Sequence, residues 1–599
     1  MKRRTEAMPS WDLSELFAGV ADPRIEKALK KTFGKAKKLK NKFKGKVSAL
    51  QPGEIGEMLG EYERILAELS KVETYAYMMF SADTSLGASG ALLRKVEHEV
   101  SLVSSELFFV ELELGMLGAD KLAFLAARKE LQNYVHYLRF LAEESKHHLS
   151  EAEEVIVSRK NLSGKNAFAR LFDEELSGER YEIFREGRKK ELGQEEILGL
   201  LYTAKDRAVR KNAAEVFSKG LKKKEKTLAF IFNTLVADKK AEDELRKFSF
   251  PEQARHLSNE LSRKEVEAMV KAVEDGYPLV KRYYLLKKKI LGVSELYDFD
   301  RYAPSPYADG KKYSFAEARR IVEEALGEFS PKFALMAEEM FQKKHIDAPA
   351  RKGKRGGAYC MYVSPRVDPF VLVNFKGSAN DVLTLAHEIG HAIHGKLASG
   401  QSYLNYRSIL PLAETASIFA EGLVFSKLAK EVKDPHEELS LYMRHIEGIF
   451  ASVQRQVAMY RFEQDVHGAF AQKGELTAKQ LGEFWTSRQE EMFGGAVKLS
   501  KGYASWWSYV SHFFQTPFYV YAYAFGELLT LSLLARYNEQ GKAFAEKFEE
   551  LLATGSFRSP HEILAKAGVD MGQGDFWKKG ISLVAEQVEH AEKLARKCL

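Results

Sequence analysis

The stretch SANDVLTLAHEIGHAIH, residues 378–394, carries the strongest structural signal in the chain. Ser378 stands three residues before Asp381, which is the spacing of a capping box, so a helix is predicted to begin here and to run through about His394. Apolar residues recur along the stretch at helical spacing and would bury one side of that helix. His387 and His391 are four residues apart, so their imidazoles project from one face.

Two imidazoles one helical turn apart can bind a single zinc ion. Glu388 follows the first of them and is expected to lie beside the metal, where it can take a proton from zinc-bound water. The alternative is two surface histidines that happen to flank a glutamate. The apolar character of the predicted helix disfavours that alternative.

A zinc site of this kind needs a third protein ligand, and two nearby positions are excluded. Position 397 is leucine, so the third histidine of the metzincin arrangement is absent. His394 lies seven residues after His387, which is roughly 10.5 Å along the helix axis, whereas ligand atoms lie about 2 Å from zinc. We therefore interpret His394 as a residue that packs beside the site or faces the substrate.

A second predicted helix, Pro411–Glu421, offers a better third ligand. Glu414, Ser417 and Glu421 lie on one stripe of this helix, and most of its other residues are apolar. A carboxylate on so apolar a helix is costly unless it is paired or bound to a metal. We assign Glu414 as the third ligand and Glu421 as the group that orients a zinc-bound histidine. The alternative for Glu421 is an ion pair with an arginine or lysine elsewhere.

The rest of the chain is predicted to be mainly α-helical, and its 599 residues predict more than one domain. Proline is scarce, and apolar residues repeat every three or four positions in several long segments. These segments are Ala91–Leu117, Ala119–Lys146, Lys205–Glu242 and Ser262–Ile290. The exception is Gly353 to Gly377, where glycines, prolines and the β-rich run Phe370–Phe375 predict a small sheet next to the zinc-binding helix.

Composition favours a cytoplasmic location and gives no sign of a membrane protein. The two cysteines, Cys360 and Cys598, exclude a disulfide framework. The first residues are basic but precede no apolar stretch, so no signal peptide is expected. The apolar stretch Trp506–Ala535 contains polar and charged residues and is interpreted as buried core. The lysine-rich run Lys30–Lys46 is interpreted as a solvated helix face, and no nucleic-acid partner is expected because no recognition motif accompanies it.

Five stretches together resemble the oligoendopeptidase F family, which is related to thimet oligopeptidase. They are GKRGGAYC (353–360), PFVLVNFKGS (369–378), DVLTLAHEIGHAIH (381–394), LAETAS (412–417) and HFFQTPFYVYAYAFG (512–526). The resemblance implies a two-lobed, mainly helical peptidase with a deep channel between the lobes. We place an N-terminal helical lobe at residues 1–190 and the catalytic region with the HEIGH motif at residues 191–599.

The resemblance also implies one zinc ion, held by the residues that match the family's ligands, with a general base beside it. Those ligands are His387, His391 and Glu414, and the base is Glu388. It implies short, unstructured peptides as substrates, because a narrow channel excludes folded proteins. Gly356 and Gly357 are expected to allow close approach of the substrate backbone. The run Phe370–Phe375 is either an edge strand to which a peptide adds or an ordinary core strand.

Members of the family place a histidine and tyrosines from the last of these stretches at the developing oxyanion. The matching residues here are His512, Tyr519, Tyr521 and Tyr523. A hydroxyl or imidazole aimed at an oxyanion lowers the barrier by a few kcal/mol. We expect His512, Tyr521 and Tyr523 to act in catalysis and Tyr519 to have a weaker role in binding. A buried aromatic cluster is the alternative for each tyrosine.

The predicted activity is hydrolysis of internal bonds in short peptides, with zinc as cofactor and Glu388 as the base. One alternative is a carboxypeptidase or dipeptidyl carboxypeptidase on the same scaffold, which would need a cation for the free C-terminal carboxylate. Another is a peptide-binding helical protein without catalysis, which the intact Glu388 disfavours. The sequence carries no signal for an oligomeric state.

Overall fold

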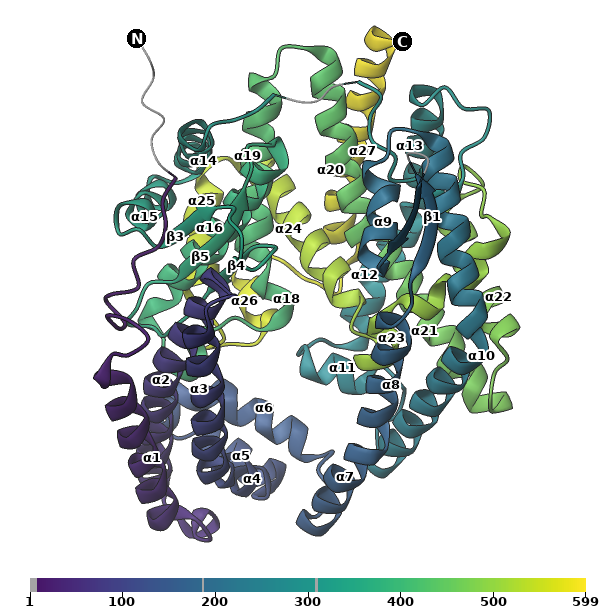
Figure 1. Ribbon diagram of the computed structural model, residues 1–599. Helices are drawn as coiled ribbons and strands as arrows, with labels where there is room; N and C mark the ends of the chain where they lie inside the picture. Colours follow the sequence, from purple (N-terminus) through teal and green to yellow (C-terminus); the bar gives the residue numbers. More distant parts are fainter. Residues whose placement is uncertain (1–7, 186–187, 308–310) are drawn as a thin grey trace. The chain divides into compact units, whose positions relative to one another are not determined.

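The computed structural model describes residues 8–185, 188–307 and 311–599 (Figure 1). Helices make up 73% of the chain, and the strands of the described part form one two-stranded and one three-stranded sheet. The prediction of a mainly α-helical protein is therefore confirmed.

The chain forms two compact units, and each is assembled from three separate segments. Unit 1 consists of Met1–Lys146, Gly310–Glu431 and Leu533–Asp570. Unit 2 consists of His147–Asp309, Val432–Ser532 and Met571–Leu599. The predicted domain boundary after residue 190 divides the chain at one point, whereas each unit combines three segments. The boundary stays a prediction.

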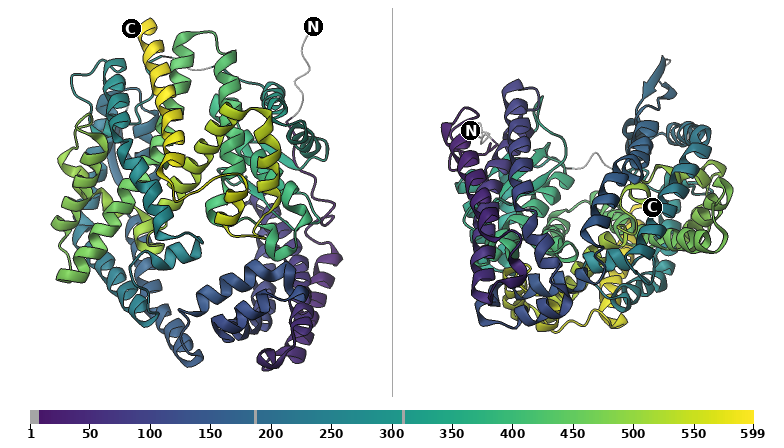
Figure 2. Two further views of the ribbon diagram at one scale, coloured as in Figure 1. Left: turned by 180° about the vertical axis from the view of Figure 1, so that it is seen from behind. Right: turned by 90° about the horizontal axis from the view of Figure 1, so that it is seen from below.

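Unit 1 begins with three long helices that pack on one another. Helices α1, α2 and α3, drawn in dark colours in Figures 1 and 2, lie side by side. The lysines of α1 meet carboxylates of this group, as in Lys35–Glu68 at 2.6 Å and Lys40–Glu106 at 3.0 Å. These pairs agree with a solvated helix face. The helices of unit 1 outside the site are α1 (Pro23–Phe43), α2 (Pro52–Ala82), α3 (Gly87–Leu107), α4 (Phe109–Gly115), α5 (Gly118–Ala126), α6 (Val135–Ser145), α14 (Phe315–Phe329), α15 (Pro331–Gln342), α17 (Tyr403–Tyr406), α25 (Lys542–Ala553) and α26 (Pro560–Lys566).

A three-stranded sheet stands next to the helix of the HEIGH motif, as predicted. Its strands are β3 (Ile346–Pro349), β4 (Tyr359–Met361) and β5 (Phe370–Phe375), in the order β3-β5-β4. Because β5 is the central strand, its interpretation as an edge strand is wrong, and β4 is the edge strand beside it. Buried Lys354 joins β3 to β5, since its ammonium group donates to the carbonyls of Asp347 (2.9 Å) and Val373 (2.6 Å).

The HEIGH motif lies on α16 (Ala379–Leu397), which begins with the predicted capping box. The Ser378 hydroxyl accepts from the Asp381 amide at 3.2 Å, and the Asp381 carboxylate accepts from the Ser378 amide at 2.8 Å. The second predicted helix is interrupted. It is divided into α18 (Leu410–Ala413) and α19 (Thr415–Glu431), with Glu414 at the junction.

Helices α16 and α19 approach each other closely at Gly390, the fourth residue of the HEIGH motif. A Cβ atom at this position would lie 2.5 Å from the Ala416 carbonyl oxygen and 2.6 Å from the Ser417 Cα atom. Both contacts are with backbone, so no side chain can move aside. Glycine is therefore what lets the ligand-bearing parts of the two helices approach.

Gly390→Ala is expected to lower the free energy of unfolding of unit 1 by about 1–3 kcal/mol, because overpacking forces the two backbones apart. It should also weaken metal binding. The measurement is a urea unfolding curve together with the metal content of the purified variant. Gly448→Ala is the matched control, because nothing lies within 4 Å of a Cβ there, and helix preference should make it neutral or stabilising by about 0.5–1 kcal/mol. Equal behaviour of the two variants would contradict the packing argument.

Unit 2 is built around long helices, and α27 packs on both α20 and α12 (yellow in Figure 2). The apolar stretch Trp506–Ala535 belongs largely to the core, as predicted, with Trp506 and Trp507 fully buried. No helix in the described part of the chain combines the length and apolar character needed to cross a membrane. The helices of unit 2 are α7 (Glu151–Ser163), α8 (Lys165–Ser177), α9 (Gln194–Thr203), α10 (Arg207–Leu245), α11 (Gln253–Ser258), α12 (Arg263–Asp275), α13 (Tyr277–Ile290), α20 (Pro435–Ser452), α21 (Gln454–Lys473), α22 (Ala478–Phe493), α23 (Ser511–Gln515) and α27 (Gly574–Cys598), and its strands are β1 (Tyr181–Arg185) and β2 (Arg188–Leu192). Helix α24 (Tyr521–Gln540) begins in the segments of unit 2 and ends in those of unit 1.

Candidate active site

Three side chains of unit 1 converge in a geometry suited to a metal ion. His387 and His391 extend from α16, and Glu414 lies at the α18–α19 junction. The Nε2 atoms of both histidines are 3.3 Å from the same Glu414 oxygen, Oε2. One ligand atom from each residue lies within 4.8 Å of the others, so a single ion between them could contact all three. These are the residues that the sequence analysis assigned as ligands.

Neighbouring groups restrain two of these three side chains. Glu421 Oε2 lies 3.2 Å from Nδ1 of His387, so it can accept that N–H and leave Nε2 free to bind a metal. The Ser417 hydroxyl donates to Glu414 Oε2 at 2.8 Å and thereby restricts the rotation of the carboxylate. Glu421 thus lies one turn along α19 from Ser417, and its role as the group that orients His387 stays a prediction.

The charges of the site favour a cation. Burial opposes a charge on His387, but its hydrogen bonds to Glu414 and Glu421 raise its pKa to about 10. Burial also acts on Glu414, but its bonds to the two histidines hold the pKa of that carboxyl well below its usual range. A divalent cation at this point supplies the positive charge that the carboxylates attract and leaves the imidazoles neutral, as metal ligands must be.

Glu388 is buried next to this group, with 6% of its surface exposed. Burial raises the pKa of the Glu388 carboxyl, while His387 and His391 lower it. A carboxylate in this setting is a stronger base than one in water, which suits a group that takes up and releases a proton.

His394 takes no part in the cluster of ligand atoms. It is 3% exposed, and its Nε2 atom lies 2.7 Å from the Ser408 hydroxyl. Burial lowers the pKa of His394 to about 3, so the ring is neutral at ordinary pH. Of the two roles considered for this histidine, the geometry favours packing beside the site.

Gly356 and Gly357 precede strand β4 and are open on the side where a Cβ would stand. Gly357 has a φ of +80°, a conformation that glycine adopts without strain. The Asn374 side chain of β5 donates to the carbonyls of Arg355 (2.9 Å) and Gly357 (2.8 Å) and fixes this turn. The backbone there is therefore both accessible and held in place.

A second group of predicted site residues lies in unit 2. His512, on α23, stacks on Tyr519 with ring centroids 5.8 Å apart and meets Tyr523 edge to face at 5.6 Å. Its Nε2 atom lies 3.2 Å from the Tyr523 hydroxyl. Tyr523 is 42% exposed, so this imidazole–phenol pair is open to solvent. Burial, assisted by Arg455, lowers the pKa of His512.

Tyr521 is separated from this group. Its side chain is fully buried, and its hydroxyl accepts from Asn259 Nδ2 at 2.9 Å and contacts His256 Nδ1 at 3.0 Å. The geometry therefore favours Tyr523 over Tyr521 as the exposed hydroxyl.

Three further residues shape this region and were not identified from the sequence. Arg255 lies over the Tyr519 ring at 5.3 Å, and Asn259 anchors Tyr521. Glu463 accepts from the Phe518 amide at 2.7 Å, where the backbone has a positive φ of 58°. These residues are distant in sequence from the residues they hold, and no local pattern marks them.

Comparison with known protein families shows to which family the chain belongs. The family model described as peptidase family M3 matches residues 200–583, which include the three converging side chains, and the model described as oligopeptidase F matches residues 113–180. The chain belongs to peptidase family M3. Within that family it is a metallopeptidase of the oligoendopeptidase F type, as the sequence resemblance indicated.

Curated relatives match along most of their length. Oligopeptidase PepF of Bacillus subtilis is 26% identical over 607 residues, covering 100% of this chain and 88% of that protein. An oligoendopeptidase F homolog of Lactococcus lactis is 26% identical over 611 residues, covering 98% of this chain and 97% of that protein. The site residues thus lie within a similarity that spans both proteins.

Solved structures share the fold. A putative peptidase from Chlamydophila abortus superposes with a TM-score of 0.87 at 23% identity, covering 99% of each chain. Oligoendopeptidase F from Enterococcus faecium superposes with a TM-score of 0.70 at 22% identity, covering 96% of this chain and 98% of that one. This M3 peptidase therefore has the architecture of oligoendopeptidase F structures.

Proposed function

We propose that this M3 peptidase is a zinc-dependent endopeptidase that cleaves internal bonds of short, unstructured peptides. The observation that carries the proposal is the convergence of two imidazole nitrogens on one carboxylate oxygen, both at 3.3 Å, beside the buried Glu388. Two nitrogens and one oxygen form the donor set of many catalytic zinc sites, in which a fourth position stays open for water or substrate. A zinc ion bound there would polarise the scissile carbonyl and lower the pKa of a water molecule.

Within this proposal, Glu388 moves the proton. Its carboxylate takes a proton from the attacking water and later passes it to the nitrogen of the departing amine. His387, His391 and Glu414 hold the metal, and Glu421 keeps Nδ1 of His387 protonated so that Nε2 faces inward.

The peptide backbone would bind along the free edge of β4. This strand lies at the edge of the sheet, and the open backbone of Gly356 and Gly357 leads into it. Main-chain hydrogen bonds to such an edge do not depend on the side chains of the peptide, which suits an enzyme that accepts many sequences.

His512 and Tyr523 are proposed to stabilise the oxyanion, and Tyr519 to support them by stacking. Tyr521 was included among the catalytic tyrosines on family resemblance. Its buried hydroxyl supports a different role, in which it positions the start of α24 through Asn259 and His256.

Replacing the two tyrosines separates these roles. Tyr523→Phe is expected to lower kcat by about 10²-fold with little change in KM, because it removes one oxyanion donor. Tyr521→Phe should lower the free energy of unfolding by about 1–3 kcal/mol, because it leaves buried partners unsatisfied, and should change kcat much less. Steady-state kinetics of both variants give kcat and KM, and their thermal unfolding gives the change in stability. A larger loss of kcat in Tyr521→Phe would assign the catalytic hydroxyl to Tyr521 instead.

The test of the proposed function is metal analysis of the purified protein combined with mass spectrometry of the products from a defined peptide mixture. We expect one zinc ion per chain, internal cleavages in peptides with amidated C-termini, and loss of activity with a chelator. An obligate carboxypeptidase would leave the amidated peptides intact. A protein that binds peptides without hydrolysing them, or that holds no zinc, would overturn the proposal.

A further inference from the structure

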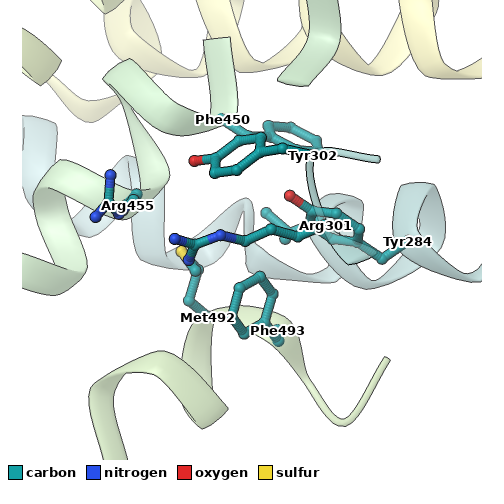
Figure 3. Close-up of a pocket in the computed structure, with 8 residues that line it drawn as sticks. Tyr284, Arg301, Tyr302, Phe450, Arg455, Met492 and Phe493 are labelled. Carbon is teal, nitrogen blue, oxygen red and sulfur yellow. The ribbon is translucent and has the colours of Figure 1, made fainter. Parts of the chain in front are cut away.

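A small cavity in unit 2 is lined by two arginines and a group of aromatic side chains (Figure 3). The volume within the cavity that the centre of a water-sized sphere can occupy is about 10 Å³. Its lining comes from α13, the turn after Asp300, α20, α21 and α22. The lining residues are Val280, Tyr284, Arg301, Tyr302, Phe450, Arg455, Met492 and Phe493.

The Arg301 guanidinium is enclosed by neutral side chains, and Arg455 beside it is half-buried. Arg301 is 4% exposed, and its guanidinium carbon lies 4.7 Å from the centroid of the Tyr302 ring. Figure 3 shows this guanidinium between Tyr302 on one side and Met492 and Phe493 on the other, directed toward the side on which Arg455 lies. Although neighbouring tyrosines raise the pKa of Arg455 overall, burial and the positive charge of Arg301 both act to lower it, so the two cations repel each other electrostatically.

Three other cations in this part of unit 2, of which Arg210 and Lys287 are buried, are paired with carboxylates. Arg210 and Arg207 both bond to Asp300, at 2.9 and 2.7 Å, and Lys287 bonds to Glu447 at 2.5 Å. Buried charges normally require such partners, because water no longer solvates them.

Among the described residues, neither the buried Arg301 nor the half-buried Arg455 has such a partner. Over the described residues, no carboxylate lies within ion-pair distance of either guanidinium. Asp298 acts on Arg301 electrostatically, but its oxygens are bonded to the Ser500 amide and hydroxyl. The two cations therefore share a cavity in which no protein anion offsets them.

Tyrosine hydroxyls satisfy only part of the hydrogen-bonding capacity of these groups. Arg301 donates to the Tyr503 hydroxyl at 2.7 Å, and Arg455 donates to the Tyr509 hydroxyl at 2.8 Å. Burial raises the pKa of Tyr503 to about 12, so its phenol is neutral at neutral pH and supplies a dipole without a charge. The buried Nε of Arg455 has no acceptor among the described atoms.

We propose that the cavity between Arg301 and Arg455 binds a small monovalent inorganic anion, with a halide such as chloride as the best fit. The charge of the site selects an anion, and its small size restricts that anion to a single monatomic ion. A carboxylate or phosphate group is larger than this space. Guanidinium N–H groups are strong donors to such an ion.

The site would act on the peptidase through His512. Arg455 lies close enough to His512 to lower the pKa of the imidazole, and a bound anion offsets the potential of that arginine. Turnover is therefore expected to respond to chloride. The binding itself does not depend on the proposed zinc chemistry, and it can be measured on metal-depleted protein.

The first experiment is crystallographic. Crystals of the unmodified protein soaked in sodium bromide are expected to show an anomalous peak between the guanidinium groups of Arg301 and Arg455. Absence of a peak there at high bromide concentration would overturn the proposal without any substitution in the chain.

The second experiment compares chloride with the bulky anion gluconate at constant ionic strength. Added chloride should raise the thermal unfolding midpoint of the unmodified, metal-depleted protein saturably, by about 2 °C or more. Arg455→Gln should lose this rise. Arg488→Gln should keep it, because that guanidinium is already paired with Asp465 and Glu491. An equal response in all three proteins would show that chloride acts without this site.

Discussion

Glu388→Gln is expected to lower kcat by about 10³–10⁴-fold while the protein still binds one zinc ion. The amide has nearly the size of the carboxylate, so the packing of α16 is preserved. It cannot take a proton from the attacking water, and the leaving amine then lacks its donor. Because Glu388 is 6% exposed, bulk water has little access to replace it as the base.

The measurement is kcat on an internally quenched peptide, together with zinc content by mass spectrometry and peptide affinity by a binding assay. Asp381→Asn is the matched control on the same helix, because Asp381 accepts from the Ser378 amide in the capping box. It should lower stability by about 1 kcal/mol and leave kcat unchanged. Turnover of Glu388→Gln within tenfold of the parent would show that another group moves the proton.

The helix of the zinc motif could be predicted because its determinants are local. The capping box, the apolar spacing and the four-residue separation of His387 and His391 are all properties of one short segment, and α16 has them as expected. The position of Glu414 depends on more distant contacts. The spacing of acidic residues suggested Glu414 as a ligand, but only the approach of α19 to α16 at Gly390 brings it beside the two histidines.

Features that depend on distant partners were predicted less well. The run Phe370–Phe375 was identified as β structure, but its central place in the sheet depends on pairing with β3 and β4. The sequence did not distinguish the inward-facing tyrosine from the exposed one, and only the packing against Asn259 shows that Tyr521 faces inward. The periodicity of Ser262–Ile290 predicts helical structure, but it does not show that α12 ends at Asp275 and that α13 begins at Tyr277 after Gly276.

Glu414→Gln and Glu421→Gln are expected to weaken zinc binding to different degrees. Glu421 acts through His387, so its loss should cost about 10–100-fold in zinc affinity. Glu414→Gln would remove a carboxylate that contacts the metal directly. The zinc affinity of this variant should fall by more than about 100-fold, and activity at ordinary zinc concentrations should be lost. The neutral amide also removes the negative charge that attracts a cation to the two imidazoles.

Competition with a chelating dye at fixed pH measures both affinities, and activity assays with added zinc show whether turnover returns. Excess zinc should restore Glu421→Gln nearly fully, because all three donors remain, and should restore Glu414→Gln poorly. Because the Ser417 hydroxyl donates to Glu414 at 2.8 Å, the zinc affinity of Ser417→Ala should lie between those of the parent protein and Glu421→Gln. If Glu414→Gln bound zinc as tightly as the parent, the third ligand would have to be another residue, and the convergence of both Nε2 atoms on Glu414 Oε2 would be an ordinary ion-pair cluster.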